Sequence, residues 1–463
     1  MPSIIASVWR CIAACAERMT EDLAAYWRAC LRQPWQTWLG LSALALAALT
    51  AVSNLPQPLQ SSTAAALALL ALLACGAQPW QALRRHPLPK LILALLLYSL
   101  LQAAVTAQPG ANLGYVRQLT LDLDPVKVLI YACVFGWWLG RYPQWIMRVL
   151  KLMALGWLLW GLAQLPWLRM DALAAGTLRL RLGYAENLTG AFASLVLLIG
   201  MYGAWLCRRN GRAPEATGLR SDAWALLTLA ALLALLFAQS RGAWLAAAVG
   251  TALLFALGRI PQRASHPLRW RRWVGLGVLA IALFAYMARP AVLQRFDGGG
   301  AAALSVLDGG AVTAAAPSIG LRLELWRFAL HLIAQRPLFG SGLASIQPAI
   351  AARGIAWQGY VPPHLHDTPL QVAAGMGLVG LLLLGAAFLL PLRDLLHAWR
   401  RDVDARPLLA LLLALCVVLL TVNLFDYLAW SNGYMRGPLE IVLGCAMAVS
   451  LRWRSSEFAL SAG

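Results

Sequence analysis

The sequence has 463 residues, of which 60% are hydrophobic and only 12% are charged, and its mean hydropathy is +0.66. Soluble globular proteins carry about 25% charged and about 45–50% apolar residues. These values exclude a soluble enzyme, a disordered protein and a coiled coil, and they indicate an all-α polytopic membrane protein. Lys and Arg exceed Asp and Glu by 38 to 19. The basic residues form small clusters between apolar runs, so nucleic-acid binding is not indicated.

Residues 1–35 predict an amphipathic helix on the cytoplasmic membrane surface. Their apolar stretch is interrupted by Arg10, and acidic residues follow it without a signal-peptide cleavage motif. The eight cysteines of the chain lie in this segment or in and beside apolar runs, and they form no Cys-x-x-Cys pair. Neither a disulfide framework nor a zinc cluster is therefore indicated.

Twelve apolar runs approach the length of about 20 residues that a helix needs to cross a membrane. They predict spans 1–9 within residues 36–289, spans 10–12 within residues 368–452, and a cytoplasmic tail at 453–463. The runs are 36–53, 63–78, 89–106, 125–140, 143–165, 187–207, 222–239, 241–258, 272–289, 368–391, 407–430 and 436–452. The seventh and eighth runs meet at Ser240-Arg241-Gly242, which predicts either a hairpin or one broken helix.

The distribution of basic residues predicts the orientation of these spans. If the N-terminus is cytoplasmic, that side receives most of the Lys and Arg residues of the short loops, including the clusters at 84–90, 208–220, 259–272 and 393–406. Both termini are then cytoplasmic. The long segment 290–367, between the ninth and tenth spans, becomes a large periplasmic loop, and loops of this length are usually functional. Its first half is rich in Gly and Ala, whereas 320–335 shows a helical pattern.

Two arginines on the predicted outer side could carry chemistry. Arg241 lies between two very apolar helices, and it either snorkels to lipid headgroups or faces an anionic substrate. Arg322 opens the helical pattern of the loop, and Arg327 follows it. These two either face solvent or pair with Glu324, or the helix N-terminus and Arg322 together bind a phosphate group.

A third polar group, Pro363-His364-Leu-His366-Asp367-Thr-Pro369, precedes the tenth span. Asp367 is a natural N-cap and Pro369 fits the first helical turn, but a cap does not explain two histidines. No further ligand set follows at helical spacing, so we predict no metal. A neutral imidazole at this depth suits a general base or a hydrogen-bond partner of a hydroxyl group.

A fourth polar group lies before the sixth span and comprises Arg179, Arg181, Glu186 and Asn187. It either forms a solvated loop or contributes to substrate binding. Asn187-Leu-Thr189 also matches a glycosylation sequon, which at a span boundary is incidental.

These motifs resemble those of the bacterial O-antigen ligases, within the wider group of O-antigen polymerases and protein O-oligosaccharyltransferases. Ser240-Arg241-Gly242 matches the Ser-Arg-Gly signature of the group. His366 followed by a polar residue, nine others, Gly377, two residues and Gly380 matches the ligase pattern. The family usually has Asn, Ser or Gln where this chain has Asp367, so the resemblance assigns no clear role to that carboxyl group.

The loop also resembles the family. Arg322 with Trp326 and the Pro337-Leu-Phe-Gly-x-Gly342 segment resembles its second arginine helix. The resemblance implies a GT-C-type bundle of about twelve helices in the inner membrane of a Gram-negative bacterium. It implies transfer of a glycan from undecaprenyl pyrophosphate to a sugar hydroxyl of lipid A-core at the periplasmic face. No nucleotide, metal or other cofactor is expected.

The residue chemistry suits such a transfer. Departure of a pyrophosphate requires cations that neutralise it, and an acceptor hydroxyl requires a base. We therefore take His366, Arg241 and Arg322 as catalytic candidates, with inversion by direct displacement. The substrate-binding candidates are Arg179, Arg181, Asn187, Arg327, His364 and Asp367.

Other functions remain open from the sequence. A polymerase of the same group would use a carrier-linked glycan as acceptor, and a protein O-oligosaccharyltransferase would use a protein. A flippase for lipid-linked glycans would need charges deep within its spans or unwound helices at mid-membrane. The informative charges instead fall at the predicted outer face, which favours an enzyme over a flippase or a membrane scaffold.

Overall fold

The computed structural model describes residues 35–51, 61–106, 112–174, 178–209, 221–258, 317–356, 359–427 and 435–461. This part of the chain is helical and contains no β-strand. The helices are α2 (Trp35–Thr50), α3 (Ser61–Ala74), α4 (Ala77–Arg84), α5 (Pro87–Thr106), α6 (Asn112–Arg141), α7 (Trp145–Gln164), η2 (Trp167–Arg169), α8 (Met170–Ala174), α9 (Glu186–Arg209), α10 (Ser221–Ala238), α11 (Arg241–Leu257), α15 (Pro317–Gln335), η3 (Leu343–Ser345), α16 (Ile346–Ala352), α17 (Thr368–Arg401), α18 (Arg406–Asn423) and α19 (Arg436–Ser461). The predicted N-terminal helix, the run at 272–289 and the Gly/Ala-rich half of the loop lie outside the described residues.

The polytopic, all-helical membrane character is confirmed. Within the described residues, six helices are long and apolar enough to cross a membrane, namely α5, α6, α7, α9, α17 and α18. The pair α3 and α4 is bent by 102° and adds a seventh candidate if it forms one span. The helices α10 and α11 are shorter but apolar. The total of twelve spans and the GT-C architecture stay predictions.

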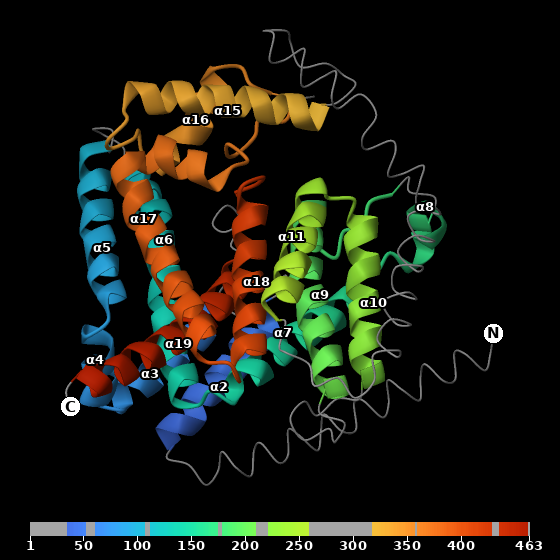
Figure 1. Cartoon of the computed structure of the whole chain (residues 1–463). Helices are drawn as coiled ribbons and strands as arrows, with labels where there is room; N and C mark the ends of the chain where they lie inside the picture. The colour runs from blue at the N-terminus through green and yellow to red at the C-terminus, as the bar shows by residue number, and fades with distance from the viewer. Residues whose placement is uncertain are drawn as a thin grey trace.

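The turn at Ser240 is a hairpin rather than a break in one helix. Helix α10 ends at Ala238 and α11 begins at Arg241, and both pack against α9. Figure 1 shows α10 and α11 running alongside each other from this turn toward the same end of the bundle. The hairpin therefore places Arg241 at the end of the bundle where α10 ends and α11 begins.

Helix α15 lies across one end of the bundle, which we call the α15 end (Figure 1). Helix α17 begins at this end and runs the depth of the bundle to Arg401, and α18 returns from Arg406. The 34 residues of α17 correspond to about 50 Å of helix at 1.5 Å per residue. The basic cluster at 393–406 therefore lies far from the α15 end.

Helix α17 is interrupted by Gly377, which has a φ of 67° and a ψ of −178°. The segment Pro337–Gly342, which follows α15, docks into this interruption. Four backbone hydrogen bonds join the two, from Leu378 to Pro337 (2.8 Å), Val379 to Leu338 (3.2 Å), Ser341 to Ala374 (2.9 Å) and Gly342 to Gly375 (2.8 Å). We call residues 374–379 the helix break and 337–342 the docking segment. The sequence analysis considers the Pro337–Gly342 segment and the glycines of the ligase pattern as separate motifs, and the structure shows that they are in contact.

A chain of buried hydrogen bonds closes the opposite end of the bundle. His86 Nδ1 accepts from the Leu88 amide (3.1 Å), so its Nε2 carries the proton and donates to Ser450 Oγ (2.7 Å). Ser450 donates in turn to Asp394, which also accepts from Arg454 Nε (2.6 Å) and Nη2 (3.0 Å). These bonds tie the start of α5 to α17 and α19.

Candidate active site

Four parts of the chain converge on one cavity at the α15 end: the start of α9, the α10–α11 turn, α15 and the end of α18. The cavity has a volume of about 130 Å³. It is lined by Arg179, Asn187, Gln239, Ser240, Arg241, Gly242, Ala243, Arg322, Val422, Phe425 and Asp426. Three arginines from separate segments thus line one small space, together with one carboxylate.

The Ser-Arg-Gly motif occupies the tight turn between α10 and α11. Ser240 is the N-cap residue of α11, and its Oγ donates to Asn187 Oδ1 (3.1 Å) at the start of α9. A Cβ atom on Gly242 would lie 3.2 Å from the Cβ of Phe425, so this position favours a residue without a side chain. The motif therefore lets the start of α11 pass close to the end of α18, and Arg241 lines the cavity beside this contact.

Arg179, which precedes α9, stabilises this turn through hydrogen bonds to the end of α10. Its Nε and Nη2 donate to the Ala238 carbonyl (3.2 and 3.1 Å), and its Nη2 also donates to the Gln239 carbonyl (3.3 Å). The last carbonyls of a helix have no partner within the helix, and a cation suits them. Arg179 therefore supports the turn that carries Arg241, in addition to lining the cavity.

Asp426, which the sequence analysis did not select, is the polar centre of the site. Its Oδ1 accepts from His366 Nδ1 (2.9 Å) and from the Tyr427 amide (2.9 Å), and its Oδ2 accepts from Asn187 Nδ2 (2.8 Å). Burial would raise the pKa of Asp426, but the hydrogen bond and charge of His366, together with His364 and Asn187, hold it below its usual range. The carboxylate is thus ionised and held by several donors.

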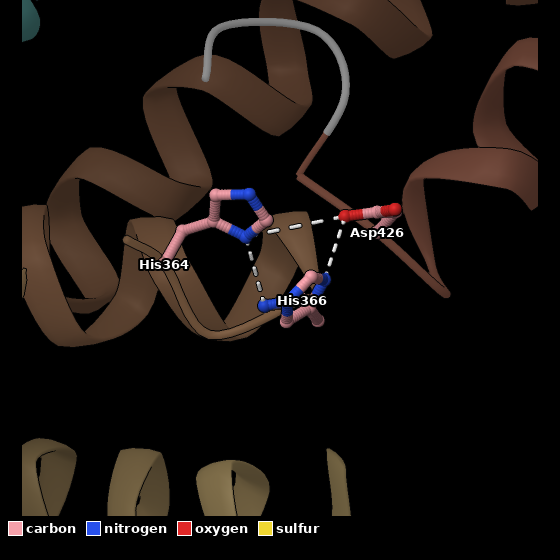
Figure 2. Close-up of side chains that lie close together, drawn as sticks. All are labelled: His364, His366 and Asp426. Atoms are coloured by element: carbon pink, nitrogen blue, oxygen red, sulfur yellow. Dashed lines mark hydrogen bonds and ion pairs between the residues drawn. The ribbon is translucent and has the colours of Figure 1, made fainter. Parts of the chain in front are cut away.

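The two histidines lie against Asp426 and against each other (Figure 2). Their rings are 4.3 Å apart between centroids, and the His366 amide donates to His364 Nδ1 (3.3 Å). The side chain of His364 is 8% exposed and that of His366 is 20% exposed. Burial lowers the pKa of His364 to about 4, and the His366 charge acts in the same direction. His364 is therefore neutral and enclosed, whereas His366 is accessible.

The hydrogen bond to Asp426 determines which nitrogen of His366 can act as a base. Asp426 is ionised and accepts, so His366 Nδ1 carries a proton, and in the neutral imidazole Nε2 is the nitrogen with a lone pair. This arrangement of carboxylate and imidazole orients a general base. Neither histidine lines the cavity itself, and both adjoin it through Asp426.

Backbone strain is concentrated at this site. In the described part of the chain, the two non-glycine residues with positive φ are Gln239 (50°) and His366 (52°). Gln239 directly precedes the Ser-Arg-Gly turn, and His366 directly precedes Asp367. Non-glycine residues in the left-handed region are uncommon and cluster at functional sites.

The predicted substrate-binding residues Arg181, Arg327 and Asp367 do not line the cavity. Arg181 is 67% exposed and pairs with Glu186 (2.7 Å), and Arg327 is exposed on α15; neither lines the cavity. Asp367 is the N-cap of α17, where its Oδ1 accepts from the Leu370 amide (2.7 Å). Burial raises the pKa of Asp367 to about 6 against this hydrogen bond. The N-cap interpretation accounts for this residue.

His364, His366 and Asp426 each offer one ligand atom, and these atoms lie within 4.8 Å of one another. The sequence argument against a metal overlooked Asp426, which comes 60 residues after His366. In the structure, however, His364 Nδ1 accepts the His366 amide, and His366 Nδ1 bonds to the carboxylate. These atoms therefore form a hydrogen-bonded cluster in the structure, and the absence of a metal stays a prediction.

Comparison with known proteins bears on the same region. The family model described as O-antigen ligase matches residues 224–385, which run from α10 into α17 and include Arg241, Arg322 and His366. No curated protein matches the chain. Asn187 and Asp426 lie outside the matched residues. The resemblance is therefore confirmed over residues 224–385, where this membrane protein is similar to the O-antigen ligase family.

Proposed function

We propose that the protein is an inverting, metal-independent glycosyltransferase that moves O-antigen glycan from undecaprenyl pyrophosphate to a sugar hydroxyl of lipid A-core. The reaction takes place at the periplasmic face of the inner membrane. One observation carries the proposal: Arg241 and Arg322 line the same cavity as Asp426, and Asp426 holds His366. The O-antigen ligase match supports glycan transfer as the reaction class.

The cavity suits the charged part of the donor. Its volume of about 130 Å³ is well below the roughly 300–1,000 Å³ of pockets that enclose a drug-sized ligand. A pyrophosphate group therefore occupies it, while the lipid and the glycan extend outside. Arg241 and Arg322 carry permanent charges and planar forks that match phosphate oxygens. Asp426 balances part of this positive charge at the side of the cavity next to His366.

The transfer step follows from this placement. His366 Nε2 removes the proton from the acceptor hydroxyl, and the oxygen forms a bond to the anomeric carbon of the donor sugar. The bond from that carbon to the pyrophosphate breaks, and the leaving oxygen keeps the electron pair. The arginines stabilise the resulting charge, and Asp426 stabilises the imidazolium. Attack opposite to the leaving group inverts the anomeric centre.

A reconstitution experiment tests the proposed function. Purified protein in proteoliposomes is mixed with undecaprenyl-pyrophosphate glycan and lipid A-core, with and without EDTA. We expect a ladder of glycosylated lipid A-core in both samples. Longer carrier-linked glycans alone would make the protein a polymerase, and glycan on protein would make it an oligosaccharyltransferase. Product that disappears with EDTA would contradict the metal-independent mechanism.

A flippase is the candidate from a different class, and one observation favours it. Inside the bundle, Arg436 pairs with Asp124 (2.6 Å), and the fully buried Glu440 lies one turn beyond Arg436. Such interior charges are typical of transport pathways. The interruption of α17, however, is filled by the docking segment. Transbilayer movement of the donor in vesicles that lack lipid A-core would support the flippase.

The orientation of the site is tested by cysteine labelling. The α15 end should face the periplasm, because the basic cluster at 393–406 lies at the opposite end of α17. In a variant without native cysteines, Arg353→Cys should react with an impermeant maleimide in spheroplasts, and Arg400→Cys should react only after lysis. Both positions are exposed. Reversed labelling would contradict a periplasmic site.

A further inference from the structure

The junction between the helix break and the docking segment is built for close backbone contact. Gly340 has a φ of 66°, and a Cβ atom there would lie 2.4 Å from the Gly375 carbonyl oxygen. A Cβ atom on Gly377 would lie 2.1 Å from the Leu338 carbonyl oxygen. No side chain fits at either position without displacing backbone. The two segments therefore meet in one defined register.

Two side chains of α5 complete this junction. Gln102 is buried, and its Nε2 donates to the Phe339 carbonyl (2.7 Å) and to the Gly375 carbonyl. One amide thus holds the docking segment and the helix break together. One turn earlier, the Tyr98 hydroxyl donates to the Met376 carbonyl, and its ring stacks on Phe339 at 6.5 Å between centroids.

The junction determines where one end of α15 lies. The docking segment continues directly from α15, since the Gly340 amide donates to the Arg336 carbonyl (3.0 Å). Arg322 lies about 20 Å along the same helix, at 1.5 Å per residue. A rigid helix fixed at one end by hydrogen bonds transmits small rotations to the other end. The position of Arg322 over the cavity therefore depends on the junction together with the packing of the buried α15 residues Leu325 and Ala329.

We propose that Gln102 is a positioning residue: through the Phe339 and Gly375 carbonyls it fixes α15, and hence Arg322, relative to α17 and His366. The inference rests on the proposed glycan transfer for its kinetic consequence but not for its structural one. Gln102 touches no substrate. Its side-chain amide contacts the junction, and the end of α15 at the junction lies about 20 Å along that helix from Arg322.

A double-mutant cycle tests the kinetic consequence. Gln102→Met keeps the length of the side chain and removes both donors, and the control Thr106→Val removes only a hydrogen bond within α5. We expect Gln102→Met to lower kcat about tenfold with little change in KM, and Thr106→Val to have no effect. In an Arg322→Ala background, Gln102→Met should lower kcat less than about twofold. A full tenfold loss in that background would contradict action through Arg322.

A distance measurement tests the structural consequence without any substrate. Spin labels are placed at the exposed positions Leu330 on α15 and Leu245 on α11, in a variant without native cysteines. We expect Gln102→Met to broaden the distance distribution, and Thr106→Val to leave it unchanged. An unchanged distribution in Gln102→Met would overturn the inference. Because this readout needs no transfer reaction, a failure of the proposed function cannot produce that result.

Discussion

Replacement of His366 by alanine should abolish measurable glycan transfer, whereas replacement of His364 should retain most of it. His366 Nε2 is the nitrogen that the hydrogen bond to Asp426 leaves free in our proposal, and loss of a general base costs about 10²–10⁴ in rate. His364 is enclosed and makes one hydrogen bond to the His366 amide. The His364→Ala variant loses this hydrogen bond, so His366 is held less firmly but remains available as the base. Initial rates in proteoliposomes, with protein levels matched, measure both effects.

Asp426 and an unrelated histidine give the controls for this result. Asp426→Asn keeps the shape of the side chain but loses the charge that stabilises the imidazolium and fixes its tautomer, so activity should fall strongly; in a carboxylate–histidine general base this change costs about 10⁴ in rate. His331→Ala changes an exposed histidine of α15 and should have no effect. Equal and mild losses in His364→Ala and His366→Ala would mean that neither is the base.

Arg241→Lys and Arg322→Lys should lower the rate of glycan transfer nearly as much as Arg241→Ala and Arg322→Ala do. Lysine keeps the charge but loses the planar fork that contacts two phosphate oxygens. Loss of a charged hydrogen bond to the leaving group costs about 10²–10³ in rate. Arg241→Lys and Arg322→Lys should therefore lower kcat substantially at normal protein levels, as measured with saturating donor and acceptor.

Arg327 provides the matched control for the arginine variants. It lies on the same helix as Arg322, is exposed, and does not line the cavity. Arg327→Lys and Arg327→Ala should therefore transfer glycan at the normal rate. Full activity in Arg322→Lys would reduce Arg322 to a general electrostatic role, and a loss in Arg327→Lys would mean that α15 binds substrate along its exposed face.

Apolar runs predicted the bounds of a helix well where the whole helix is apolar. The runs 89–106 and 143–165 correspond to α5 (Pro87–Thr106) and α7 (Trp145–Gln164). Helix α6 instead begins well before its apolar run and carries Pro125 inside it. Its earlier turns contain the buried Asp122 and also Asp124, which pairs with Arg436 inside the bundle. Such pairing does not appear in hydropathy.

The candidate site was predictable only where local motifs mark it. Arg241, Arg322 and His366 stand out because polar residues interrupt apolar sequence. Asp426 gave a similar signal, since it falls within the apolar run 407–430, and an ionisable residue in a predicted span is a functional candidate. Its pairing with His366 spans 60 residues and follows from packing of α17 against α18, which periodicity does not encode.

The hydrogen-bonded chain at the opposite end of the bundle constrains how the protein is made. His86 and Ser450 are separated by 364 residues, so the second partner is synthesised long after the first. Until α19 is in place, Asp394 lacks Ser450 and Arg454 and keeps only the neighbouring Arg393 and His86 as partners among the described residues, and burial of a carboxylate that lacks part of its donors is costly. Insertion of α19 is therefore the step that completes this hydrogen-bonded chain. A nascent chain arrested before Ser450 should be recognised as unassembled and degraded by membrane proteases.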